Sequence, residues 1–231
     1  MRPFGEARGL ERLLKMSVAH PINVVVSHPA AAAPELIVIA ASAGGLDAVG
    51  SVLSHLPANF PVPLAVVVHR GEASVMAEIL GRRCPFRVKD AEEGESLQPG
   101  IVYLAPPRRH LIVRSDRTFH LMDGRTIRHV YSSANPLFES SARALSGRVI
   151  AVVLTGSGTD ATDGVQTIKG MGGTVIAQDP ACSAFAGMPR AAIRTGTVDR
   201  VLALKDIPTT LVQLVTGKPL ASMAATDIEP L

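Results

Sequence analysis

The sequence contains little of what marks a disulfide-rich, membrane-spanning or strongly charged protein. Its 231 residues include 2 cysteines, no tryptophan and only 3% aromatic residues, and the formal net charge is +3. Two cysteines are too few for a disulfide scaffold, and neither lies in a C-x-x-C motif, so a reducing, cytoplasmic location is expected. No apolar run approaches the length of a transmembrane helix, and the N-terminus lacks the apolar stretch of a secretory signal. We therefore expect no membrane insertion, and the small net charge gives no reason to expect a nucleic-acid partner.

Aliphatic residues, in contrast, are abundant. Hydrophobic residues make up 47% of the chain, and with so few aromatics the core must be built from Val, Leu, Ile and Ala. That composition is typical of a parallel sheet covered by helices, and the length fits one α/β domain. An Ala/Pro run at residues 29–34 has the composition of a linker. We expect an N-terminal extension at residues 1–34, a folded domain at residues 35–217 and a tail at residues 218–231.

Short apolar runs alternate with helical patterns along the folded domain. Strands are predicted from residue 36 and at residues 61–69, 86–89, 101–105, 149–154, 174–177 and 198–202. Helices are predicted from residue 46 and at residues 74–83, 136–145, 161–171, 189–194 and 206–215. Residues 110–113 and 118–122 predict a β-hairpin attached to the main sheet. The pattern indicates an α/β fold with a doubly wound, mostly parallel sheet and helices on both faces.

The first predicted strand ends in a turn of small residues, Ala41-Ser42-Ala43-Gly44-Gly45, directly before a helix. Such a turn presents a serine at the sheet edge where ligands and chemistry gather in open α/β folds. Three interpretations stay open. Ser42 caps the helix, Ser42 is a nucleophile on a sharp turn, or Gly44-Gly45 forms a phosphate turn that lacks the usual fingerprints.

Two further strands also end in a polar residue, His69 and Asp160. Because the carboxyl ends of parallel strands share one edge, Ser42, His69 and Asp160 are expected to converge. A serine, a histidine and a carboxylate are the groups that acyl transfer requires. Alternatives remain for the carboxylate, since Asp160 suits a helix cap and Asp163 is a rival one turn later. No histidine or cysteine has a partner at metal-ligand spacing, so neither a metal nor an organic cofactor is expected.

Residues 36–202 resemble the catalytic domain of the chemotaxis protein-glutamate methylesterases in the order and spacing of their motifs. The matching stretches are Ile39-Ala40-Ala41-Ser42-Ala43-Gly44-Gly45, the strand ending at His69, Glu92-Glu93-Gly94-Glu95 with Pro99-Gly100, Tyr103-Leu104-Ala105-Pro106 with His110, Leu137-Phe138-Glu139-Ser140, Leu154-Thr155-Gly156-Ser157-Gly158-Thr159-Asp160, and Phe185 with Gly187-Met188-Pro189-Arg190-Ala191. The resemblance implies that Ser42 is the nucleophile, His69 the base and Asp160 the orienting carboxylate. It also implies hydrolysis of methyl esters on glutamate side chains of chemoreceptor helices, sometimes with deamidation of glutamine.

The sequence departs from that family at several positions. Ala43 follows the nucleophile where Ser or Thr is usual, Arg70-Gly71 follows the base in place of a Met-Pro type turn, Ser157 replaces a bulkier residue and Asn135 an acidic one. The 34 residues before the domain are too few for the N-terminal receiver domain of the best-known members. We therefore expect a stand-alone form that is active without a phosphodonor and is controlled by a separate response regulator or by expression level.

Two further expectations concern the surroundings of the site. The backbone N–H groups of Ala43 and Ser157 are candidates for an oxyanion hole. Arginines outnumber acidic residues around the hairpin, which indicates either an electrostatic footprint for an acidic receptor helix or an ordinary solvated face. These arginines are Arg108, Arg109, Arg114, Arg117, Arg125 and Arg128, against Asp116 and Asp123. The alternative function is a non-catalytic receptor-binding or signalling module on the same fold.

Overall fold

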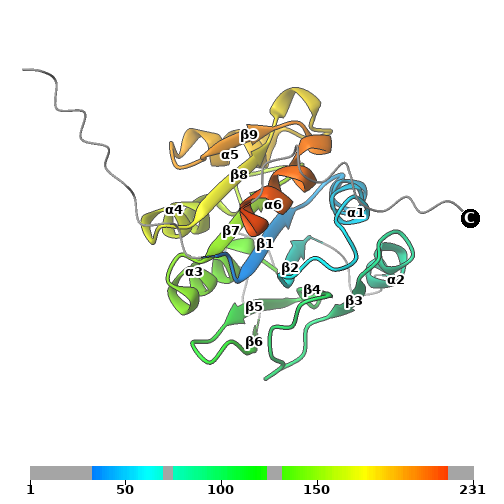
Figure 1. Ribbon diagram of the computed structural model, residues 1–231. Helices are drawn as coiled ribbons and strands as arrows, with labels where there is room; N and C mark the ends of the chain where they lie inside the picture. Colours follow the sequence, from blue (N-terminus) through cyan, green and yellow to red (C-terminus); the bar gives the residue numbers. More distant parts are fainter. Residues whose placement is uncertain (1–32, 70–74, 124–131, 218–231) are drawn as a thin grey trace, which may run out of the picture. The chain divides into compact units, whose positions relative to one another are not determined.

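A computed structural model describes residues 33–69, 75–123 and 132–217 of the chain (Figure 1). The strands are β1 (Leu36–Ala41), β2 (Leu64–Val68), β3 (Arg87–Asp90), β4 (Ile101–Leu104), β5 (Arg109–Val113), β6 (Phe119–Asp123), β7 (Val149–Val153), β8 (Thr174–Gln178) and β9 (Arg200–Leu202). The helices are α1 (Gly45–Ser54), α2 (Met76–Gly81), α3 (Ala134–Leu145), α4 (Thr162–Gly170), α5 (Gly187–Arg194) and α6 (Ile207–Thr216), with short 3₁₀ turns η1 (Pro180–Cys182) and η2 (Leu204–Asp206).

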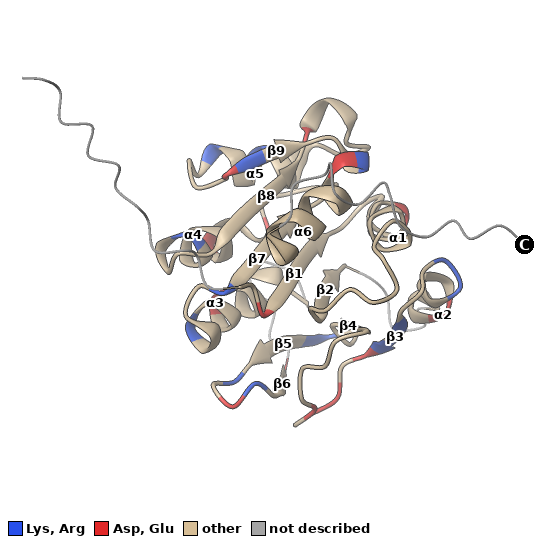
Figure 2. Ribbon diagram, viewed as in Figure 1, with Lys and Arg blue, Asp and Glu red and all other residues tan. Residues whose placement is uncertain are grey.

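Seven strands form one sheet in the order β3-β4-β2-β1-β7-β8-β9, and every neighbouring pair is parallel. The central strands β1, β2 and β7 are buried along their whole length, which explains their continuous apolar sequences. Figure 2 shows the same feature, since these strands carry no charged residue and the charges lie on the elements around them. The sheet order places β1 between β2 and β7, so the residues that follow these three strands are neighbours.

The two faces of the sheet bury separate cores. Alternate residues of β1 point to opposite sides, so Val38 belongs to one core and Ile39 to the other. Helices α3, α4 and α5 cover the first face, with Phe138 and Ile168 among the residues that they bury there. Helices α1, α2 and α6 cover the second face. Helices on both faces of a parallel sheet confirm the predicted doubly wound α/β class.

The hairpin of β5 and β6 is an antiparallel pair that forms a two-stranded sheet of its own. It joins the main fold by packing, because Leu111 and Phe119 are buried in the same core as the helices of the first face. A side-chain hydrogen bond also ties it to α3, since the amide of Val113 donates to Ser140 Oγ at 3.0 Å. The expected hairpin is therefore present, but it does not pair with the seven-stranded sheet. Packing and backbone hydrogen bonds to residues 94–97 attach it, such as the one from the Phe119 amide to the Glu95 carbonyl at 2.8 Å.

The charges around the hairpin are largely paired. Arg109 lies 2.9 Å from Asp123, Arg114 lies 3.3 Å from Glu93, and Arg117 lies 2.8 Å from Glu35. Glu35 also pairs with Arg148. Each of these arginines is thus matched by a carboxylate, which favours the ordinary solvated face over a basic footprint. Two of the predicted arginines, Arg125 and Arg128, lie outside the described residues.

Most element boundaries agree with the sequence-based predictions to within about two residues. Ser133 is the N-cap of α3. The expected extension at 1–34, apart from its last two residues, and the tail at 218–231 lie outside the described residues, as do Arg70 and Gly71. None of the helices in the described ranges is long and apolar enough to cross a membrane.

Candidate active site

Three neighbouring strands deliver the predicted residues to one edge of the sheet. Ser42 directly follows β1, His69 directly follows β2, and Asp160 follows the turn after β7. Parallel pairing continues past the strand ends, since the His69 amide donates to the Ala41 carbonyl at 3.3 Å and the Ser42 amide donates to the Thr155 carbonyl at 3.0 Å. The backbone therefore places Ser42 between the two other segments before any side-chain contact is considered.

The turn after β1 is made possible by its two glycines. Gly44 has φ of 74°, a left-handed conformation that favours glycine, and it precedes α1 without any side-chain cap. At Gly45, a Cβ atom would lie 2.8 Å from the Ala41 Cβ, so only glycine fits there without a shift. Ser42 does not cap α1, so the helix-cap interpretation of this serine is wrong. Its hydroxyl is instead directed at His69.

The imidazole of His69 bridges the other two side chains. Its Nδ1 lies 3.0 Å from Ser42 Oγ, and its Nε2 lies 2.9 Å from Asp160 Oδ2. An ionised carboxylate only accepts hydrogen bonds, so Nε2 carries the proton that is donated to Asp160. In the neutral ring this leaves Nδ1 as an acceptor for the Ser42 hydroxyl. The arrangement is the one that a nucleophile and its general base require.

Asp160 is nearly buried, and protein groups donate several hydrogen bonds to it. Its side chain is 6% exposed, against 21% for that of His69. Oδ2 accepts hydrogen bonds from His69 and from the Ala134 amide at 2.8 Å, and Oδ1 accepts from Ser133 Oγ at 2.6 Å and the Ala161 amide at 2.9 Å. Burial acts to raise the pKa of Asp160, but the hydrogen bonds from His69, Ser133 and Ala134 outweigh it and bring the pKa below its ordinary value. The carboxylate is therefore ionised at neutral pH. Asp163, the rival carboxylate, does not take this place.

The glycine-rich turn after β7 packs against Ser42. A Cβ atom at Gly156 would lie 2.9 Å from the Ser42 Cβ and 2.3 Å from Met188 Sδ, so a glycine is required for this close approach. The Gly156 amide donates to the Phe185 carbonyl at 2.9 Å. For the amides of Ala43 and Ser157, no hydrogen-bond partner is recorded in the part of the chain that the structure describes. The turn that carries Ser157 therefore lies against the segment that carries Ser42.

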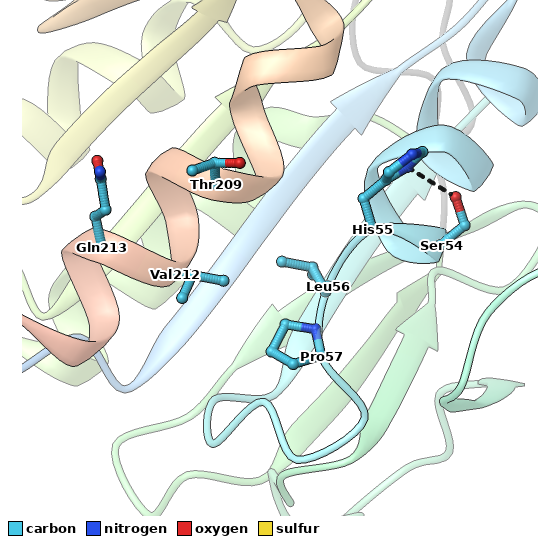
Figure 3. A pocket seen from close by; sticks show the side chains of 7 residues that line it. All are labelled: Ser54, His55, Leu56, Pro57, Thr209, Val212 and Gln213. Carbon is cyan, nitrogen blue, oxygen red and sulfur yellow. Dashed lines mark hydrogen bonds between the residues drawn. The ribbon is translucent and has the colours of Figure 1, made fainter. Parts of the chain in front are cut away.

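A pocket of about 340 Å³ lies elsewhere, between the end of α1 and α6 (Figure 3). It is lined by Ser54, His55, Leu56, Pro57, Thr209, Val212 and Gln213, none of which belongs to the cluster described above. Ser54 and His55 stand at the opposite end of α1 from Ser42. Despite its volume, this pocket is not the candidate active site, because none of its lining residues is a carboxylate that could orient His55.

Sequence reasoning missed the residues that surround Asp160. Ser133 and the amides of Ala134 and Ala161 all bind this carboxylate, and the sequence analysis singled out none of them. A serine before a helix signals only a helix cap. Within residues 33–69, 75–123 and 132–217, no group of three or more His, Cys, Asp and Glu side chains has the arrangement of a metal site.

Comparisons with known proteins agree with this geometry. Residues 37–211 match the family model for the CheB methylesterase. The crystal structure of the Thermotoga maritima CheB methylesterase catalytic domain superposes with a TM-score of 0.76 and 35% sequence identity, covering 79% of this chain and 99% of that chain.

Curated relatives give the same picture at the sequence level. A protein from Leptospira interrogans, named provisionally for protein-glutamate methylesterase and protein-glutamine glutaminase activity, is 38% identical over 182 residues, which are 78% of this chain and 94% of that protein. A protein-glutamate methylesterase/protein-glutamine glutaminase from Anaeromyxobacter dehalogenans is 41% identical over 186 residues, and one from Myxococcus xanthus is 40% identical. The matches cover 80% of this chain but only 54% and 53% of these two proteins, so the chain spans about half of their length.

Proposed function

This chain belongs to the CheB methylesterase family, and on that premise we propose that it hydrolyses methyl esters of glutamate side chains in chemoreceptors, with Ser42, His69 and Asp160 as its catalytic residues. The observation that carries the proposal is the continuous contact from Ser42 through His69 to Asp160, at 3.0 and 2.9 Å. Family membership favours this hydrolase over the non-catalytic module and over a nucleotide-binding protein. Those alternatives need neither a base on the serine nor a carboxylate behind the base.

In the first half of the reaction, Ser42 Oγ attacks the carbonyl carbon of the ester. His69 Nδ1 takes the hydroxyl proton, and Asp160 stabilises the resulting imidazolium through Nε2. Collapse of the tetrahedral intermediate breaks the bond to the methoxy oxygen, which receives the proton from His69 and leaves as methanol. The glutamyl group is then joined to Ser42 as an ester.

In the second half, water replaces the serine. His69 Nδ1 accepts a proton from the water as it attacks the acyl carbon, and the same proton returns to Ser42 Oγ when the acyl bond breaks. The products are a free glutamate carboxylate and the original enzyme. A glutamine side chain would follow the same route with ammonia as the leaving group, which is the second activity in the names of the relatives.

The negative charge on the carbonyl oxygen requires donors that are in place beforehand. The Ala43 amide follows the nucleophile directly, a position that supplies such a donor in other hydrolases with a serine on a strand–helix turn. The Ser157 amide comes from the turn that packs on Ser42 through Gly156. We assign these two groups to the oxyanion hole, and each is expected to contribute about 2.7–4 kcal/mol to transition-state stabilisation.

The proposal places the protein in the cytoplasm, where the signalling helices of methylated receptors are accessible, and no cofactor is needed for this chemistry. A separate response regulator is a proposed partner in control of the activity. The test is to incubate the purified chain with methylated receptor membranes and to measure methanol release. Release that disappears in the Ser42→Ala variant is the expected result. Receptor binding without release would favour the non-catalytic module.

A further inference from the structure

Ser133 connects the N-terminus of α3 to the carboxylate behind the base. Its hydroxyl lies 2.6 Å from Asp160 Oδ1, and the residue is only 2% exposed. Ser133 is also the N-cap of α3, since its Oγ accepts a hydrogen bond from the Asn135 amide at 3.3 Å. This burial keeps Ser133 from contact with a substrate in solution.

These contacts fix the direction of the hydroxyl proton. The Asn135 N–H occupies a lone pair of Ser133 Oγ, and the single hydroxyl hydrogen is left for Asp160, which can only accept. The backbone of Ser133 is fixed as well, because its amide donates to Nδ1 of the buried His110 at 3.2 Å. The hydroxyl is therefore fixed by its own two hydrogen bonds, and the backbone that carries it is fixed by the bond to His110.

Without this hydroxyl, the two oxygens of Asp160 would be unequally held. Oδ2 would keep His69 and the Ala134 amide, but Oδ1 would keep only the amide of Ala161, its neighbour in the chain. The carboxylate would then be freer to rotate about its Cβ–Cγ bond, and the His69 ring that depends on Oδ2 would lose its fixed orientation.

We infer that Ser133 is a positioning residue of the active site, which acts through Asp160 to orient His69 toward Ser42. This inference rests on the proposed function, because it assigns a role in the same reaction. Since Ser133 is buried away from substrate, its loss reduces kcat and leaves KM nearly unchanged. The titratable groups around Asp160 are His69, His110 behind Ser133, and Asp163 in the first turn of α4.

The experiment compares Ser133→Ala with Ser133→Thr in the full chain. Loss of a hydrogen bond to a charged group predicts a kcat about 10- to 100-fold lower in Ser133→Ala, with KM within about twofold. Threonine keeps a hydroxyl that can both cap the helix and donate to Asp160, so Ser133→Thr is expected within about threefold of the unmodified chain.

Two control serines separate this role from structural effects. Ser132, the preceding residue, donates to the Pro106 carbonyl at 3.3 Å, and Ser140 on α3 binds the Val113 amide. Ser132→Ala and Ser140→Ala are expected to lower Tm by a few degrees without moving kcat. If Ser133→Ala shows the same pattern as these controls, the residue is only a helix cap and the inference is overturned.

Rates of fluorophosphonate reaction at Ser42, measured across pH on the same variants, distinguish the two levels of the proposal. If the unmodified chain does not react, Ser42 is not the nucleophile, and both the proposed function and the positioning role of Ser133 are wrong. A reactive unmodified chain whose rate and pH profile are unchanged by Ser133→Ala would overturn the positioning role alone. A slower reaction in Ser133→Ala that Ser133→Thr restores is the result we expect.

Discussion

Among the residues that the structure describes, two serine–histidine side-chain contacts of nearly equal length lie at opposite ends of α1. Ser42 Oγ lies 3.0 Å from His69 Nδ1, and Ser54 Oγ lies 3.1 Å from His55 Nδ1. The second pair lines the 340 Å³ pocket, whereas the first stands at the carboxyl edge of the sheet. Neither the contact distance nor the adjacent cavity distinguishes a nucleophile from a structural pair.

The surroundings of each histidine make the difference. His55 Nδ1 also lies 2.8 Å from the carbonyl of Ser51, and because a carbonyl only accepts, this nitrogen carries the proton. It therefore cannot take a proton from Ser54, and both residues are exposed. His69 has its proton fixed on the opposite nitrogen by Asp160, so Nδ1 is left as a base. The carboxylate and its buried donors, and not the serine–histidine contact, define the site.

The largest effect should come from breaking the first pair. Ser42→Ala or His69→Ala is expected to lower kcat about 10³-fold or more, as removal of a nucleophile or base does in other serine hydrolases. Ser54→Ala and His55→Ala are the matched controls and should retain full activity. Initial rates of methanol release measure both sets, and circular dichroism checks that each variant is folded. An equal loss in the two sets would contradict the distinction between the pairs.

The next effect separates the two carboxylates near the start of α4. Asp160→Asn keeps the shape but removes the charge that fixes the proton on Nε2, and a loss of about 10⁴ in kcat is the precedent from a serine protease triad. Asp163→Asn should remain close to the unmodified chain, because the carboxylate that His69 Nε2 contacts is that of Asp160. If Asp160→Asn had no effect and Asp163→Asn lowered kcat, the assignment of the orienting carboxylate to Asp160 would be wrong. Single-turnover rates at neutral pH provide the measurement.

A smaller effect on stability and activity is expected from the close approach of Gly156 to Ser42, which the Ser54–His55 pair lacks. Gly156→Ala would push its Cβ into Met188 Sδ and Ser42 Cβ, and overpacking of this kind costs about 1–3 kcal/mol of unfolding free energy. Activity should fall with it, because Ser42 is displaced. Gly170→Ala on α4 is the control, since a Cβ there meets no atom within 4 Å and helix propensity favours alanine. Urea unfolding measures the unfolding free energy of both variants. Equal values for Gly156→Ala and Gly170→Ala would refute this prediction.

The lowered pKa of Asp160 predicts a modest dependence of stability on pH. A carboxylate whose folded pKa lies below its ordinary value of 3.8 contributes stability that is complete above that value and is lost as pH falls through the folded pKa. The unfolding free energy of the unmodified chain should therefore decrease below about pH 4, partly through this group. Asp160→Asn removes the contribution and should flatten the slope in that range. Parallel slopes for the two proteins would contradict the shift.

The smallest effects on stability and on KM are expected from the charges around the hairpin. Arg109 and Asp123 are 47% and 87% exposed, and surface ion pairs of this kind contribute about 0–1 kcal/mol. Arg109→Ala should change the unfolding free energy by less than about 1 kcal/mol and KM for receptor membranes by less than about twofold. A large rise in KM that salt abolishes would restore the hypothesis of a basic footprint for an acidic helix.

Much of the fold was predictable because the strands are continuous apolar runs. Val149–Val153 and Leu64–Val68 are buried throughout, so their sequences needed no knowledge of neighbours. The placement of Ser42 and His69 followed from the same rule, since each is the first residue after such a strand. Family membership and the α/β class are confirmed, whereas the catalytic roles of the three residues remain predictions.

The remaining features depend on contacts between distant segments. Ser133 lies 27 residues from Asp160, and its sequence signal was that of an ordinary N-cap. The need for glycine at Gly156 arises from Met188 on α5, which no local pattern reveals. The hairpin was predicted, but its attachment depends on α3 and on backbone hydrogen bonds to residues 94–97, which are distant in the sequence. Tertiary packing decides each of these points.

The most direct measurement of the central claim is covalent labelling of the full chain with a fluorophosphonate, followed by mass spectrometry of the peptides. The account predicts one label per molecule, located on Ser42, with no label on Ser54 and none on the Ser42→Ala or His69→Ala proteins. The label should also form more slowly in Asp160→Asn. A label on Ser54, or undiminished labelling of Ser42→Ala, would contradict the assignment of Ser42 as the nucleophile.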